Sequence, residues 1–275
     1  MLQLFKTEIK KFKDNSTIIL LGVFFITLMP FVILTLKGIF KDATGPIKAI
    51  SEIYDLPMIW EYQGYAASWL VFFFLGFMVL QMFTNEVSQR TMRQNIIFGY
   101  TKKEFFSAKV SVIICLTICA TTLYALSSVI IGIFHTPGFD FELLMDNNWA
   151  ILRFFLNTLG TLSFALLVAI IFRRGGLSMF IYFAYPLILE PIMRGLTIWA
   201  LIKGGKPHWT IMNYFPMNTI EDLMVFPLIR TSSDFLNIQE NMSPVHPYSI
   251  AIVMGTIYTT LFLYLAWKSF EKSDI

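Results

Sequence analysis

The chain has 275 residues, of which 56% are hydrophobic and only 14% are charged, whereas soluble domains carry about 25% charged residues. This composition excludes a water-soluble globular domain and indicates an integral membrane protein. The net charge of +3 is too small to indicate nucleic acid as a partner.

The first 14 residues have an amphipathic pattern. At about 100° per residue of helix, Leu2, Phe5, Ile9 and Phe12 fall on one face, and lysines occupy its flanks and back. This pattern is typical of a helix that lies among lipid headgroups. We therefore expect residues 1–14 to form an interfacial helix that contacts membrane lipid; an ordinary solvated basic leader is the alternative.

Six apolar segments are long enough to cross a bilayer, which takes about 20 residues of helix. They cover residues 17–36, 64–83, 110–134, 150–172, 176–202 and 248–267. Because unpaired backbone groups cannot face lipid, and no alternating barrel pattern is present, we predict an all-α membrane protein with six transmembrane helices in one domain, residues 1–275. The first segment exceeds the apolar region of a signal peptide, about 7–15 residues, so we expect a permanent anchor.

The distribution of cations predicts the orientation of the bundle. With the N-terminus inside, thirteen of the 21 Lys and Arg residues lie in cytoplasmic segments and six lie in outer loops. The positive-inside rule therefore predicts a multi-pass protein with both termini in the cytoplasm.

Residues 203–247 join the last two spans on the outer side and are too apolar for a polar linker. A structureless loop of this length is unusual, and five prolines limit the length of any regular piece. We therefore predict short outer helices between spans five and six.

Residues 84–109, between spans two and three, form a predicted cytoplasmic elbow. Gly99 is placed like the residue after a helix end, where a left-handed turn costs glycine little. Thr101 and Glu104 have the spacing of a capping box, which satisfies the free N–H groups of a new helix. The segment is thus predicted to form a short helix, a sharp turn and a long helix that enters the third span.

The elbow also has side chains suited to binding a partner. Its tip places apolar and aromatic residues among cations: Ile96, Ile97, Phe98 and Tyr100. Aromatic anchors of this kind are common in binding hot spots. Before the tip, Glu86, Arg90 and Arg93 share one helical side, available for partner contacts or mutual pairing. The alternative is an apolar tip that folds back onto the membrane surface.

Glu190 and Arg194 form a predicted polar pair within the fifth span. A helix stacks residues four apart, and ionisable residues at membrane depth are candidates for function. Pro191 removes one backbone hydrogen bond at this point. A self-neutralising structural pair and a role at a subunit interface or translocation path both remain open.

Several common catalytic and nucleotide-binding motifs are absent from the sequence. It has no His-Glu-x-x-His zinc motif, no Gly-x-Ser-x-Gly elbow and no phosphate-binding loop. We therefore expect no enzyme activity and no cofactor bound by this chain. His135, His208 and His246 are scattered over outer loops and do not predict a metal site, and Cys115 and Cys119 share one apolar helix face as packing residues.

The run Glu86-x-Ser88-x-Arg90-Thr91-x-Arg93, followed by Gly99-Tyr100-Thr101-Lys102-Lys103-Glu104-Phe105-Phe106-x-Ala108-Lys109, resembles the ABC-2 type permeases, the membrane subunits of ATP-binding-cassette exporters. The topology resembles that family over nearly the whole chain, and the motif over about 25 residues. One departure is Arg90, where many members have Gly before the Thr, so the local turn differs.

This resemblance implies that the elbow is a coupling helix seated in a separate ATPase subunit. The implied coupling residues are Glu86, Arg90, Thr91, Arg93, Ile96, Ile97, Phe98 and Tyr100, with Gly99, Thr101 and Glu104 capping the joint. It further implies two ATPase copies that hold ATP and Mg²⁺, a second permease in a homo- or heterodimer, and a location in the plasma (inner) membrane of a bacterium.

Two other functions stay open at this point. One is an ion-coupled secondary carrier that uses Glu190 and Arg194; the absence of matched broken-helix halves counts against it. The other is a non-transporting membrane scaffold that docks an ATPase. The substrate is not predicted by the sequence.

Overall fold

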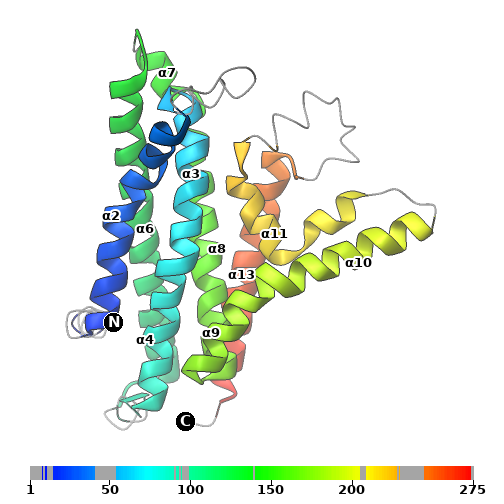
Figure 1. Ribbon diagram of the computed structural model, residues 1–275. Helices are drawn as coiled ribbons and strands as arrows, with labels where there is room; N and C mark the ends of the chain where they lie inside the picture. The colour runs from blue at the N-terminus through cyan, green and yellow to red at the C-terminus, as the bar shows by residue number, and fades with distance from the viewer. Residues whose placement is uncertain are drawn as a thin grey trace.

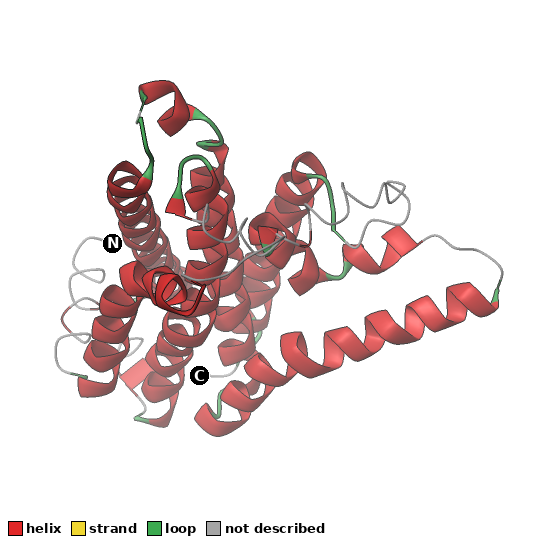
Figure 2. Cartoon of the chain, turned by 45° about the horizontal axis from the view of Figure 1, so that its top comes forward, coloured by secondary structure: helices red, strands yellow, loops and turns green. Residues whose placement is uncertain are grey.

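The computed structural model describes residues 8, 10, 15–40, 54–89, 91–92, 94, 99–138, 140–204, 209–227, 229 and 245–273. These residues form helices and the turns between them, and none of them lies in a strand (Figure 2).

The helices follow one another along the chain in this order: α2 (Ser16–Phe40), α3 (Met58–Leu70), α4 (Gly76–Ser88), α6 (Lys102–His135), α7 (Phe141–Met145), α8 (Trp149–Phe172), α9 (Gly175–Ala184), α10 (Glu190–Lys203), α11 (Pro216–Glu221) and α13 (Tyr248–Glu271). The π-helical turn η2 (Val71–Leu75) joins α3 to α4, and η3 (Tyr185–Leu189) joins α9 to α10. Two short 3-10 helices, η4 (Trp209–Tyr214) and η5 (Asp222–Met224), flank α11.

Five helical stretches are long and apolar enough to cross a membrane: Met58–Ser88, Lys102–His135, Phe141–Phe172, Gly175–Leu201 and Tyr248–Glu271. They contain the second to sixth predicted spans. The first predicted span, residues 17–36, lies within α2, whose described apolar part, Ser16–Phe31, is shorter than the other five. A sixth span therefore stays a prediction. The predicted interfacial helix, residues 1–14, lies outside the described residues except for Glu8 and Lys10.

Helix α8 lies at the centre of the bundle, with α13, α4 and α6 packed around it (Figure 1). Most of its length is buried, and the buried positions include small residues such as Ser163, Ala165 and Ala169. Small side chains let neighbouring helices approach closely inside a membrane. This explains why one helix can contact three others along its length.

The π-turn η2 is held by a tyrosine from α9. A π-turn interrupts the regular ladder of backbone hydrogen bonds, and the Tyr182 hydroxyl donates to the carbonyl of Phe72 at 3.0 Å. The two rings stack with centroids 4.9 Å apart. The hydroxyl occupies the space beside Gly76, where an added Cβ would lie 1.9 Å from it. Glycine at position 76 therefore permits the close approach of α9 and α4.

A buried arginine joins three helices at the end of the bundle that carries α7. Arg153 is 1% exposed, and its two terminal nitrogens donate to the Glu61 carboxylate at 2.6 and 3.2 Å. Asn147 and Tyr248 also donate to that carboxylate, at 2.7 and 2.9 Å. A buried charge is tolerated only when it is paired and hydrogen-bonded. This Glu61–Arg153 network ties α3, α8 and α13 together.

The stretch from α9 to α10 leaves the bundle. Figures 1 and 2 show α10 running outward from the other helices, and apolar residues such as Leu196 and Trp199 are 60% and 62% exposed. The chain then returns, because α11 and η5 pack against α8 and α13. These short helices lie within the predicted outer segment, residues 203–247, of which 205–208, 228 and 230–244 lie outside the described residues.

We predict that Gly76→Ala lowers the stability of the protein by about 1–3 kcal/mol, because overpacking forces Tyr182 away from the Phe72 carbonyl. The thermal unfolding midpoint in detergent micelles measures this effect. The matched control is Gly195→Ala in α10, where an added Cβ meets nothing within 4 Å and alanine favours helix. Equal midpoints for the two variants would contradict the packing role of Gly76.

Candidate functional site: the coupling elbow

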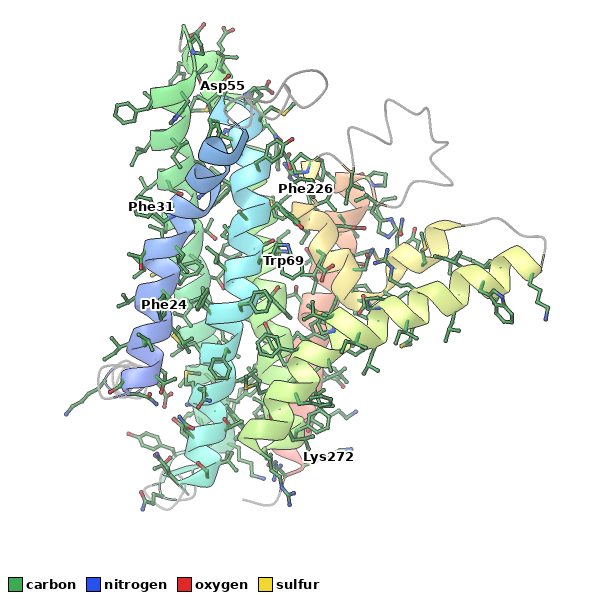
Figure 3. All side chains as sticks on the ribbon, viewed as in Figure 1. Phe24, Phe31, Asp55, Trp69, Phe226 and Lys272 are labelled. Atoms are coloured by element: carbon green, nitrogen blue, oxygen red, sulfur yellow. The ribbon has the colours of Figure 1, made fainter. Side chains whose placement is uncertain are left out.

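The elbow lies at the end of the bundle that also holds the start of α2 and the end of α13 (Figure 1); Lys272, labelled in Figure 3, marks this end. Helix α4 ends at Ser88, and the Thr91 hydroxyl donates to the carbonyl of Glu86 at 3.3 Å. Gly99 has a φ of +93°, which is the left-handed turn that glycine adopts readily. The chain therefore reverses just before α6 begins.

A capping box fixes the start of α6. The Glu104 backbone N–H donates to the Thr101 hydroxyl at 3.2 Å, and the Thr101 N–H donates to the Glu104 carboxylate at 2.9 Å. Both bonds satisfy N–H groups that have no partner within the helix. The first turn of α6 is thus held in a defined position relative to the Gly99 turn.

Lys102 connects the same turn to the end of α13. Its ammonium group donates to the carbonyls of Glu271 and Ser273, at 3.0 and 2.8 Å. Carbonyls at a helix end lack helical partners and attract cations. The start of α6 and the end of α13 are therefore joined directly.

An aromatic cluster packs beneath this joint. Phe270 of α13 stacks on Phe105 of α6 with ring centroids 5.6 Å apart, and it meets Phe83 of α4 edge-on at 6.3 Å. Phe106 lies beside Trp267, at 5.3 Å. Aromatic pairs of this geometry add to the stability gained from burial. They lock α4, α6 and α13 together one turn away from the elbow.

Lys109 is the centre of a buried ion cluster, which we call the Lys109 cluster and which also contains Glu86 and Glu8. Lys109 is 1% exposed, and its ammonium lies 2.6 Å from a carboxylate oxygen of Glu86. The same ammonium also pairs with Glu8, from the N-terminal segment. The Lys109 cluster therefore connects the N-terminal segment, α4 and α6 through charges that need one another, because an unpaired buried charge is costly.

Glu86 thus has a different environment from the one expected. The sequence places it on a helical side available to a partner, but the structure buries it against Lys109. The reason is that the elbow folds α6 back along α4, which brings Lys109 to Glu86. Glu86 is therefore paired within the chain, and its part in coupling to an ATPase stays a prediction.

The other predicted coupling residues divide into two groups. Thr91 and Tyr100 are half-buried in the structure, and Gly99 is exposed. The remaining five lie outside the described residues: Arg90, Arg93, Ile96, Ile97 and Phe98. Met92, which the sequence analysis did not single out, is buried in the core and anchors this part of the elbow to the bundle.

The predicted polar pair of span five is arranged differently from a stacked ion pair. The Glu190 carboxylate accepts hydrogen bonds from the backbone N–H groups of Met217 and Asn218, at 3.1 and 2.6 Å. Among the described ion pairs none joins Glu190 to Arg194, and the Arg194 Nε has no hydrogen-bond partner. Glu190 binds the first turn of α11 because free backbone donors there are strong partners for a carboxylate.

No group of three His, Cys, Asp or Glu side chains is placed to hold a metal ion in the described part of the chain. His135 lies against Tyr54, with ring centroids 5.3 Å apart, and His246 lies against Tyr214, at 4.4 Å. These two histidines thus have aromatic contacts, while His208 lies outside the described residues.

The fold and the elbow define a helical membrane protein in which the joint between α4 and α6 is braced on three helices. A family model described as "ABC-2 family transporter protein" matches residues 4–188, which is more than half of the chain and includes the elbow. The chain belongs to the ABC-2 transporter family and is a membrane permease of an ABC transporter, a transport component that is not itself a catalytic enzyme. A comparison with curated proteins gives no match.

We predict that Lys109→Met destabilises the protein by about 3–5 kcal/mol, because it leaves the carboxylates of Glu86 and Glu8 buried without their cation. The thermal unfolding midpoint in detergent measures the loss. A second substitution in the same chain, Glu86→Gln, should restore part of the lost stability, because it removes one of the uncompensated carboxylates. Lys103→Met is the control, since Lys103 is exposed; a midpoint as high as that of this control would contradict the role of the Lys109 cluster.

Proposed function

We propose that this chain is one of two permease subunits of an ATP-binding-cassette exporter in the plasma membrane of a bacterium, with both termini and the elbow in the cytoplasm. The family match supports an ABC transporter permease and implies association with an ABC ATPase. Export, the two copies of the ATPase and the second permease are part of our proposal.

The bracing of the elbow is the observation that carries this function. A coupling helix transmits movement only if its joint does not fray. Here the Thr101–Glu104 cap, the Lys102 bonds and the Lys109 cluster connect the elbow to α4, α6 and α13. A displacement imposed on the elbow would therefore reach three helices at once.

Hydrolysis is assigned to a partner, because the sequence has no phosphate-binding loop. ATP and Mg²⁺ would be held by two ATPase subunits, and this chain would supply the surface that they move. A second permease, either another copy of this chain or a related one, would complete the translocation path between the two bundles.

An ion-coupled carrier is less well supported by the arrangement of Glu190. Such a carrier needs a carboxylate that exchanges its partner during transport. Glu190 instead accepts two backbone hydrogen bonds at the start of α11. Its role in the described structure is to hold α11 against α10.

We predict that Phe98→Asp abolishes co-purification of the ATPase subunit, since a charge at an apolar anchor opposes its burial in a partner. Co-expression with the ABC ATPase subunit of the transporter, followed by affinity purification, measures this. Phe141→Asp, at an exposed position of α7, is the control for a charged residue at the other end of the bundle. Undiminished recovery of the ATPase with Phe98→Asp would refute the proposed docking.

We further predict that Thr101→Ala separates docking from transmission. Removing the cap costs about 1 kcal/mol and frays the first turn of α6, but leaves the tip of the elbow unchanged. The ATPase should still co-purify, while its stimulation by the permease falls several-fold in a hydrolysis assay. Full stimulation would show that the cap does not contribute to coupling.

A further inference from the structure

A cavity of about 280 Å³ lies between α3, α8, α10 and the segment formed by α11 and η5. One side of it is aromatic: Tyr65, Trp69, Phe72 and Phe226. Figure 3 shows Trp69 on α3 and Phe226 beside α11. The rings are in contact, since Tyr65 lies 5.1 Å from Phe226 and 6.3 Å from Trp69 between centroids.

The opposite side of the cavity contains polar atoms without partners. Asn157 is 3% exposed, and its amide nitrogen donates to the Ile220 carbonyl at 2.8 Å. Its oxygen has no hydrogen-bond partner, nor has the Arg194 Nε. Buried polar groups are normally hydrogen-bonded. Both residues line the cavity, which makes this part of its wall polar.

Two carboxylates line the same side and differ in their contacts. Asp222 accepts hydrogen bonds from the Asn218 amide and from the His246 backbone, at 3.3 and 3.1 Å. Glu221 has no hydrogen bond or ion pair with any described residue. It borders the cavity with its carboxylate available to a bound molecule.

The charges around the cavity favour a cation. Glu221 and Asp222 line it with two carboxylates, Arg194 lines it with one guanidinium, and Glu190 lies close enough to affect Glu221. Desolvation by the surrounding residues, followed by the charge of Glu190 and then of Asp222, raises the pKa of Glu221 to about 7, although the side chain is exposed and Arg194 opposes this rise. A carboxylate whose ionisation is disfavoured by its surroundings gains from a nearby cation. The aromatic faces attract cations as well.

We propose that this cavity binds a small organic ammonium ion with an aromatic or branched apolar body. Its ammonium group pairs with the Glu221 carboxylate, and its apolar body packs on Trp69 and Phe226. If the chain is an exporter permease, as proposed above, such cations would enter its translocation path; this consequence rests on the proposed function. Binding itself needs only the permease.

The test uses the purified full-length chain in lipid nanodiscs, without an ATPase, and isothermal titration calorimetry. The probes are 2-phenylethylamine, its neutral counterpart 2-phenylethanol, and the anion 3-phenylpropanoate. We expect the amine to bind at least tenfold more tightly than the alcohol, and the anion to bind most weakly. Absence of amine binding, or equal affinity for amine and alcohol, overturns the proposal.

Glu221→Gln should lower the affinity for 2-phenylethylamine at least tenfold and leave the affinity for 2-phenylethanol unchanged. Glu142→Gln, which removes an exposed carboxylate of α7, is the matched control and should have no effect. Retained amine affinity in Glu221→Gln overturns the proposal. Retained binding of 2-phenylethanol shows that the cavity of the variant is intact.

The unmodified protein gives an independent measurement. Because the pKa of Glu221 is near 7, its carboxylate is mostly protonated at pH 6 and mostly ionised at pH 8, so amine affinity should rise several-fold between these values. Glu190, Arg194 and Asp222 face Glu221; His246 adjoins Asp222, and burial lowers its pKa below the ordinary value. A flat profile overturns the proposal. The docking of Phe98 and this binding can fail separately, since only the first requires the ATPase.

Discussion

The structure depends on one constraint: a charged group buried among apolar helices must have an opposite charge or hydrogen-bond donors within contact. Glu61 with Arg153 satisfies it at one end of the bundle, and Glu86 with Lys109 satisfies it at the other. The first pair joins α3 to α8, which lie far apart in the chain, and the second joins α4 to α6 across the elbow. Removing one partner leaves an uncompensated buried charge. These pairs therefore specify which helices pack together, and they also stabilise that packing.

The position of the second pair gives the elbow its mechanical properties. Glu86 lies at the end of α4 and Lys109 lies two turns into α6, so the turn between them is closed by an ion pair. The bonds from Lys102 to the end of α13 extend the joint to a third helix. A transporter whose energy source is a separate subunit needs a surface that moves as a unit with its helices, and this geometry provides one.

In the other half of the molecule, α10 leaves the bundle and the chain after it returns through α11 and η5. Glu190 holds α11 through two backbone N–H groups, and Glu221 of α11 lines the same cavity as the aromatic residues of α3. Arg194 and Asn157 are left with polar atoms that the described residues do not satisfy. Both residues line the cavity, so this part of its wall is polar.

The sequence by itself determined the features that depend on local chemistry. Apolar length predicted five spans that the structure contains, and the Thr101–Glu104 spacing predicted the turn that begins α6, because both follow from residues close together in the chain. Only the tertiary structure decided the pairings of Glu86 with Lys109 and of Glu61 with Arg153, which lie 23 and 92 residues apart. It also turned Glu190 toward α11. Such contacts depend on how helices pack, and hydropathy and spacing carry no information about which buried charge meets which.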